Sequence, residues 1–265
     1  MNKYSVLALY LLYLSLRMPG FSYPTKVTVT MFDVGQGDAI MLEIDSKIII
    51  VDGGPTFEID RLLNRKLPIN KCYIDVVVIT HPHKDHINGL KRLNQHCEIG
   101  LVVYNIGFYG SLDIQSYIGN SKIIELTYTD TVYIGEVGLH VFWPMRDFPD
   151  SNINNNSIVL LLDYKEFEML LMGDIETTSS VKLDIIRMQE YIQDNLDVFK
   201  IPHQGSIDSL NSTIFSVLKP KVCLLSVGKG NHFGHPHPKT IETINNYECS
   251  LFRTDYLGTI EVYVY

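Results

Sequence analysis

The sequence predicts an α+β fold in which two β-sheets pack face to face and helices cover their outer sides, a four-layer αββα sandwich. Three observations predict it. Strand patterns dominate the chain after residue 26, and helical patterns join them toward the C-terminus. The 265 residues are 46% hydrophobic, which is ordinary for a globular protein with a real core. We expect one domain over residues 26–265.

The first half of this domain is predicted to be mostly strands. Val27, Val29 and Met31 alternate with threonines, which is typical of a half-buried strand. A hairpin is expected from 39–44 and 47–51, and the run 74–79, apolar except for Asp75, indicates a strand buried on both faces. Helices are expected at 58–66 and 88–97, and further strands at 101–105, 122–126, 138–143, 158–163 and 168–172.

Helices and strands mix in the second half. Val181, Ile185, Met188 and Ile192 share one face at helical spacing, which predicts a long helix. After it we expect strands at 198–201, 222–227 and 260–264, and helices at 212–218 and 239–247.

Residues 1–25 are expected to lie outside this domain. Residues 4–16 are apolar, fewer than the roughly 20 that cross a membrane comfortably. They fit a secretory signal, the end of a membrane helix that begins in a longer protein, or a buried helix. We favour a membrane or export segment, followed by a linker at Pro19, Gly20 and Pro24. The domain would then be secreted, or lie at the cell membrane on the extracellular side.

The charge and the cysteines exclude several classes of function. A net charge of −8 excludes a surface that attracts polyanions broadly, so nucleic acid would need a local basic patch or bound metal ions. None of the four cysteines forms a CxxC pair, which argues against a zinc knuckle or a redox motif. Their pairing as disulfides is left open.

The strongest chemical signal is the run His81-Pro82-His83-Lys84-Asp85-His86, directly after the predicted strand 74–79. Imidazoles two positions apart can bind one metal ion, and Asp85 and His86 can hold a second. This donor set suits zinc, manganese or iron(II). The alternative is a solvated loop with chance histidines, but three of the nine histidines fall within six positions. Asp85 is also a candidate catalytic group.

Other strand ends offer further ligands. Asp174 follows the strand 168–172 and Gly173, and is a candidate bridging ligand or, alternatively, a helix N-cap. His203 ends the strand 198–201 and is a candidate ligand, although alone it would be an ordinary loop histidine. Asp52 is interpreted as a carboxylate that orients a ligating imidazole.

Four more residues are candidates near such a site. His235 and Lys229 lie in a loop that can place charge or a proton donor over a phosphate, or is simply rich in Gly and Pro. Asn156 points into the site or forms an Asx turn. Asp38 is expected to line the site, whereas Asp33 is expected to be structural.

Seven stretches resemble the metallo-β-lactamase superfamily and, more closely, the C-terminal domain of ComEC-type DNA-uptake channels. They occur in the family's order and span nearly all of the chain after residue 26. The stretches are FDVGQGDA (32–39), VDGGP (51–55), THPHKDHINGL (80–90), NNSIVL (155–160), LMGDIE (171–176), KIPHQGS (200–206) and GHPHP (234–238).

The resemblance implies an αββα sandwich with two divalent ions, zinc or manganese, at one edge of the sheets. His81 and His83 would bind one ion, Asp85 and His86 the other, and Asp174 would bridge them. It also implies nuclease activity on the DNA strand that is not transported, and a membrane channel as partner.

The chain departs from the family at two places. Relatives usually have His-His-Gly-Ser where this chain has His203-Gln204-Gly205-Ser206, so Gln204 ligates weakly or only donates a hydrogen bond. The superfamily's isolated histidine before Asp174 has no clear counterpart, although Asn156 stands near that place.

Three hypotheses follow. The first is a metal-dependent phosphodiesterase or nuclease with DNA as its substrate. The second keeps the metals but hydrolyses a small ester, such as a phosphocholine ester or a lactone. The third, motivated by Gln204, is a binding or assembly module with a weakened site.

Overall fold

The computed structural model describes residues 27–67, 72–105, 114–146 and 150–265. The predicted N-terminal segment, residues 1–25, lies outside the described residues. Within the described ranges, no helix has the length and apolar character needed to cross a bilayer.

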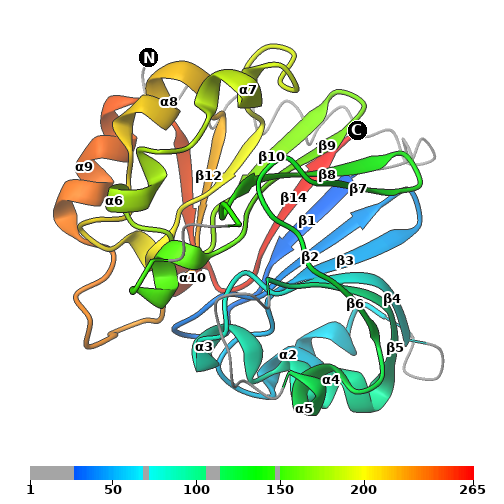
Figure 1. Ribbon diagram of the computed structural model, residues 1–265. Helices are drawn as coiled ribbons and strands as arrows, with labels where there is room; N and C mark the ends of the chain where they lie inside the picture. Colours follow the sequence, from blue (N-terminus) through cyan, green and yellow to red (C-terminus); the bar gives the residue numbers. More distant parts are fainter. Residues whose placement is uncertain (1–26, 68–71, 106–113, 147–149) are drawn as a thin grey trace, which may run out of the picture.

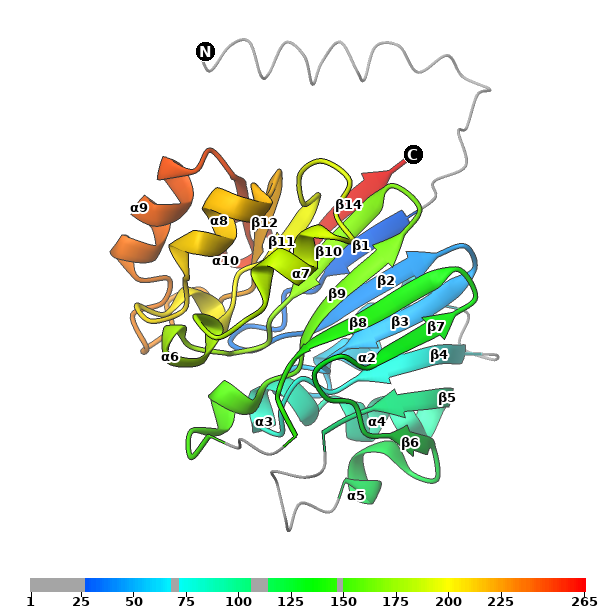
Figure 2. The same cartoon turned by 45° about the horizontal axis from the view of Figure 1, so that its top comes forward.

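Two seven-stranded sheets face each other, which confirms the predicted sandwich (Figures 1 and 2). Both sheets are mixed, with antiparallel pairs at one side and parallel pairs at the other. The first sheet has the order β14 (Ile260–Val264), β1 (Val27–Met31), β2 (Ile40–Ile44), β3 (Lys47–Val51), β4 (Cys72–Val78), β5 (Cys97–Val103) and β6 (Lys122–Ile124). The second has the order β13 (Ser250–Arg253), β12 (Val222–Leu225), β11 (Val198–Lys200), β10 (Phe167–Leu171), β9 (Val159–Tyr164), β8 (Val137–Trp143) and β7 (Thr131–Ile134).

Helices form the two outer layers (Figure 1). Those beside the first sheet are α2 (Glu58–Leu63), α3 (Lys84–Ile87), α4 (Leu90–His96) and α5 (Gln115–Ile118). Those beside the second are α6 (Thr177–Ser180), α7 (Ile185–Gln189), α8 (Ser212–Leu218) and α9 (Pro238–Asn246), with α10 (Thr254–Leu257) following β13.

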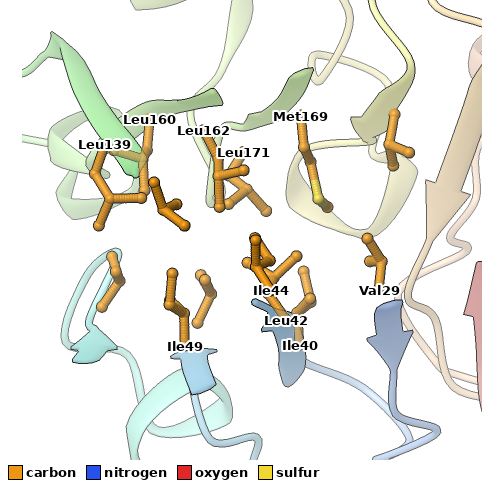
Figure 3. Close-up of a cluster of buried hydrophobic side chains, with 14 of the residues drawn as sticks. Val29, Ile40, Leu42, Ile44, Ile49, Leu139, Leu160, Leu162, Met169 and Leu171 are labelled. Carbon is orange, nitrogen blue, oxygen red and sulfur yellow. The ribbon is translucent and has the colours of Figure 1, made fainter. Parts of the chain in front are cut away.

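The core has three layers, as the strand patterns require. Between the sheets, Leu42 and Ile49 of the first sheet point toward Leu160 and Met169 of the second (Figure 3). A second cluster lies between the first sheet and its helices, and a third between the second sheet and its helices. Strand β4 contributes Val76 and Val78 to the first cluster and Ile74 and Val77 to the second, so its largely apolar run does reflect burial on both faces.

The predicted long helix through Val181 and Ile192 is wrong. The segment instead forms the short helices α6 and α7, and Val181 is 65% exposed. The Asp184 carboxylate accepts a hydrogen bond from the Arg187 backbone N–H at 3.0 Å and caps α7, so a new helix begins there. Ile185 and Met188 keep their predicted place in the core. Strands β7 and β13 were not predicted.

Two disulfides answer the question that the cysteine spacing left open. Cys72 and Cys97 join the paired strands β4 and β5, and Cys223 and Cys249 join β12 to the residue before β13. Disulfides of this kind persist in oxidising compartments, so they indicate a location outside the cytoplasm.

The Cys72–Cys97 bridge should stabilise the domain by restricting the unfolded chain. Replacing both residues by Ala should lower the free energy of unfolding by about 3 kcal/mol, because the bridge closes a loop with a sequence separation of 25. Urea denaturation measures this loss. The matched variant without Cys223 and Cys249, with a separation of 26, should lose a similar amount. Unchanged urea midpoints would contradict the expectation.

Candidate metal centre

The loop after β4 turns directly into α3 and gathers three imidazoles. The backbone N–H of His86 donates to the carbonyl of His83 at 2.9 Å, and this hydrogen bond forms the first turn of α3. The His81 ring lies 4.7 Å from the His83 ring and 4.2 Å from the His86 ring, measured between centroids. His81 and His86 are fully buried, whereas His83 and Asp85 are partly exposed. The cluster is therefore buried at His81 and His86 and reached by solvent at His83 and Asp85.

Asp52 fixes the orientation of His86, as predicted. Its Oδ2 lies 2.7 Å from Nδ1 of His86, and its Oδ1 accepts the Thr80 backbone N–H at 2.9 Å. The Thr80 hydroxyl donates to the same carboxylate at 2.6 Å. With Nδ1 bound in this way, Nε2 of His86 points away from Asp52 and can serve as a metal ligand.

Asp174 stands on that opposite side. Its Oδ2 is 3.2 Å from Nε2 of His86, and its backbone N–H donates to the Ser157 hydroxyl at 3.1 Å. Gly173 has φ +51°, and a Cβ there would lie 2.8 Å from the Ser157 side chain, so only glycine allows this close approach. Glu176, not Asp174, is the N-cap residue of α6, so the structure does not use Asp174 as that cap.

These residues fit a metal ion. One potential ligand atom each from His81, His86 and Asp174 lies within 4.8 Å of the others, and all three residues are buried. Among the described residues, Nε2 of His81 and Oδ1 of Asp174 have no hydrogen-bond partner. Buried polar atoms normally have partners, so these two orphans point to an absent ligand. The buried His and Asp clusters are consistent with a binuclear site, and imidazole with carboxylate is a suitable donor set.

The electrostatics favour positive charge at this position. Burial lowers the pKa of His81 well below its ordinary value, which keeps its ring neutral and available as a ligand. Burial also opposes charge on His86, but the carboxylates of Asp174 and Asp52 raise its pKa well above the usual value. Although burial works in the other direction, His86 and Lys200 hold the pKa of Asp174 well below its ordinary range. The buried carboxylates of the site therefore favour the binding of a cation.

His203 and His235 lie on the rim of the site. The His203 backbone N–H donates to the Gly173 carbonyl at 3.2 Å, which brings it beside Asp174. Its ring, however, faces Asn154 at 3.4 Å and Ser206 at 3.3 Å, and it is not part of the buried group of ligand atoms. The His235 ring lies 5.6 Å from the His203 ring, and burial and His203 together lower the pKa of His235.

Asn156 and Lys229 are not brought to the buried centre. The Asn156 side chain accepts the Asp150 backbone N–H at 2.8 Å and donates to the Asp150 carbonyl at 2.7 Å, so it holds the preceding loop through contacts six residues back, which are not those of an Asx turn. Lys229 is exposed at the start of the loop that carries His235. Asn154, which the sequence did not single out, is the asparagine that reaches the rim at His203.

Gln204 occupies the inner position where the motif of relatives has a second histidine. It is buried with φ +45°, and its Nε2 donates to Oδ2 of Asp174 at 2.9 Å. Gln36 contacts the other end of the amide, with its Nε2 at 3.4 Å from Oε1 of Gln204. Gln204 therefore donates a hydrogen bond to a predicted ligand in this structure.

Sequence reasoning missed Lys200. This lysine is buried beside the site, where its ammonium contacts Asp38 and Asp174. The available signal was a single charged residue in the otherwise apolar strand 198–201. Asp38 lies beside His86, as expected for a residue that lines the site, and Asp33 is exposed. A Cβ at Gly37 would clash with the Asp85 carbonyl, so this glycine lets the 35–38 loop approach the cluster.

Known protein families and sequences include relatives of this chain. The model of the metallo-beta-lactamase superfamily matches residues 32–228. The chain is 26% identical to ComE operon protein 3 of Bacillus subtilis over 91% of its length, and 23% identical to Recombination protein 2 of Haemophilus influenzae, also over 91%. It spans only 34% and 29% of those two proteins.

A solved structure has the same fold. The metallo-beta-lactamase fold protein YhfI of Bacillus subtilis superposes with a TM-score of 0.61 at 13% identity, covering 89% of this chain and 100% of YhfI. The chain belongs to the metallo-β-lactamase superfamily, and over most of its length it is a distant homologue of ComE operon protein 3 and Recombination protein 2.

Proposed function

We propose that this metal-dependent hydrolase is a phosphodiesterase that cleaves DNA. The observation that carries the proposal is the buried group of His81, His86 and Asp174, next to which the rings of His203 and His235 lie 5.6 Å apart. The homology to a protein named for recombination supports nucleic acid as the substrate class.

His81, His83 and Asp174 would hold one divalent ion, and Asp85, His86 and Asp174 would hold the other, with His203 as an outer ligand or rim residue. When bound, two such ions, zinc or manganese, would provide an activated water and compensate the charge of phosphate oxygens. Asp52 keeps His86 in position, and Ser157 keeps Asp174 in position.

The rim residues would bind the phosphate and the leaving group. His235 would offer a ring N–H to a phosphate oxygen, and Lys229, exposed in the same loop, would add a positive charge. His203, next to Asp174, is placed to serve the leaving oxygen. The side chain of Asn156 would hold the neighbouring loop through Asp150 and leave Asn154 to contact His203.

An exposed aromatic ring near His235 supports a nucleic-acid substrate over a small ester. Phe233 is 69% exposed in the loop of His235, with its ring 5.9 Å from the His235 ring. Asn231 fixes this loop, because its side chain accepts the N–H groups of Phe233 and His235 at 3.1 Å each and donates to the His235 carbonyl. A rigid exposed aromatic ring beside a phosphate site can stack on a nucleobase of a single strand.

The location and partners are also part of the proposal. The two disulfides favour the extracellular side. Residues 1–25 would attach the domain to the cell membrane, and a membrane channel would deliver the DNA. The curated relatives are about three times longer than the matched region, which leaves room for such a channel in them.

Removing a ligand should abolish DNA cleavage. His81→Ala and Asp174→Asn should each lower the cleavage rate of a labelled oligonucleotide with manganese or zinc at least about 100-fold, because each removes a group that holds the ions. His96→Ala is the matched control, since this exposed histidine pairs with Asp60 away from the site and should leave the rate unchanged. A wild-type protein that cleaves no DNA with zinc, manganese or magnesium, but hydrolyses a lactone or phosphocholine ester, would refute the proposal.

Phe233 should separate DNA from small substrates. Phe233→Ala should lower kcat/KM on single-stranded DNA about 10-fold, the effect of one lost base stack, and leave hydrolysis of bis(p-nitrophenyl) phosphate unchanged. Tyr133→Ala removes an equally exposed aromatic ring from β7 and should affect neither substrate. Equal losses on both substrates would show that Phe233 only shapes the loop.

Gln204 should limit the second ion. Gln204→His replaces an amide with an imidazole beside Asp174 and should raise the number of manganese ions bound per chain at limiting metal, as measured by equilibrium dialysis and elemental analysis. Gln204→Asn, which keeps an amide, is the control and should not increase the number. Equal occupancy in wild type and Gln204→His would contradict a weakened second site.

A further inference from the structure

Lys200 is buried between the two sheets at the base of the metal centre. It is the last residue of β11 and is 1% exposed. Its ammonium donates to the Gly173 carbonyl at 2.9 Å, forms an ion pair with Oδ2 of Asp38, and lies 3.7 Å from Oδ1 of Asp174. Asp38 comes from the first sheet and Asp174 from the second, so one cation contacts the loops of both sheets.

A buried ammonium group is costly unless it compensates nearby negative charge. Three carboxylates here are fully buried, those of Asp38, Asp52 and Asp174. Asp52 is bound by Thr80 and His86, and Asp174 has His86 and Gln204 at one oxygen. His86, whose pKa Asp174 and Asp52 raise, compensates part of this charge, and Lys200 supplies a second cation that also reaches Asp38.

Asp38 depends on Lys200 most strongly. Burial raises the pKa of Asp38 to about 6, although Lys200 opposes this shift. Apart from the ammonium, the nearest charged partner is Nδ1 of His86 at 3.9 Å, and Oδ1 of Asp38 has no hydrogen-bond partner in the described part of the chain. Without Lys200, Asp38 would be a buried carboxylate with little compensation.

Asp38 also belongs to a second group of potential ligands, with Asp52 and His86. In this group, Nδ1 of His86 bonds to Asp52 at 2.7 Å and Oδ2 of Asp38 pairs with Lys200, so only Oδ1 of Asp38 lacks a hydrogen-bond partner within the described residues. The group has no imidazole nitrogen left for a metal ion. By contrast, the group of His81, His86 and Asp174 keeps a free imidazole nitrogen on His81 as well as a carboxylate oxygen of Asp174 without a hydrogen bond.

We propose that Lys200 is a built-in cation of the metal centre, which compensates Asp38 and Asp174 when no metal is bound. Lys200 and the metal then stabilise the same carboxylate, Asp174, and each partly replaces the other. The group of Asp38, Asp52 and His86 is a charge-balanced support beneath the centre and binds no metal ion. The inference rests on metal binding in the proposed function but not on DNA cleavage.

The test is the thermal stability of the full chain with and without metal. Lys200→Met should lower the Tm of chelator-treated protein by about 10 °C, because it leaves buried carboxylates uncompensated. Saturating manganese or zinc should restore at least about half of that loss, so the metal-induced rise in Tm is larger than in wild type. Lys221→Met is the control. This exposed lysine pairs with Asp197 at 2.8 Å, and its loss should not change the metal-induced rise.

Several outcomes would overturn the inference. An equal loss of Tm with and without metal would make Lys200 purely structural, and a smaller metal-induced rise would make it a requirement for metal binding. A wild type without any metal-induced rise would overturn the proposed function as well. If Lys200→Met does not fold, Asp38→Asn combined with Lys200→Met removes both charges and should fold. Asp38→Asn alone should keep the wild-type number of bound ions, and the loss of one would assign Asp38 to a metal.

Discussion

The hydrogen bond between Asp52 and His86 is the contact on which the arrangement of the site depends. Asp52 follows β3, and His86 lies in α3 after β4, so the bond joins two neighbouring strand ends of the first sheet. It sets which nitrogen of His86 faces the second sheet, where Asp174 lies at the end of β10. Loss of that one bond would leave the Nδ1 side of the ring without a partner, because among the described residues no second buried carboxylate lies within hydrogen-bond distance of Nδ1.

The centre is built where loops from both sheets meet. The Thr80 carbonyl accepts the Ile158 backbone N–H, and the Gly173 carbonyl accepts both the His203 N–H and the Lys200 ammonium. Each loop is held by another loop, and two of the approaches need glycine, at positions 37 and 173. Short backbone contacts between loops therefore position the residues of the site, and the two packed sheets hold these loops in place.

Much of this was predictable from the sequence, for identifiable reasons. Strands with a strong apolar period, such as β1 and β4, were found within a residue or two because burial dictates their pattern. The site motif was found because three closely spaced histidines after a core strand are rare unless they bind a metal.

The helix through residue 192 was wrong because periodicity alone does not reveal a cap such as Asp184. Lys200 was missed because its meaning lies in partners that are 26 and 162 positions away in the chain, Asp174 and Asp38. His203 lies at the strand end that the sequence predicted. The backbone, however, places the side chain of Gln204, and not the ring of His203, against the Asp174 carboxylate.

All four cysteines are consumed in the two bridges, and both bridges lie near the starts of their strands, whereas the histidine loops follow the ends. No thiolate therefore remains to compete for an incoming ion, and the donor set is restricted to nitrogen and oxygen. Oxidation of the sulfur atoms and loading of the ion are chemically independent steps. The polypeptide can complete the first in an oxidising compartment and bind an ion afterwards.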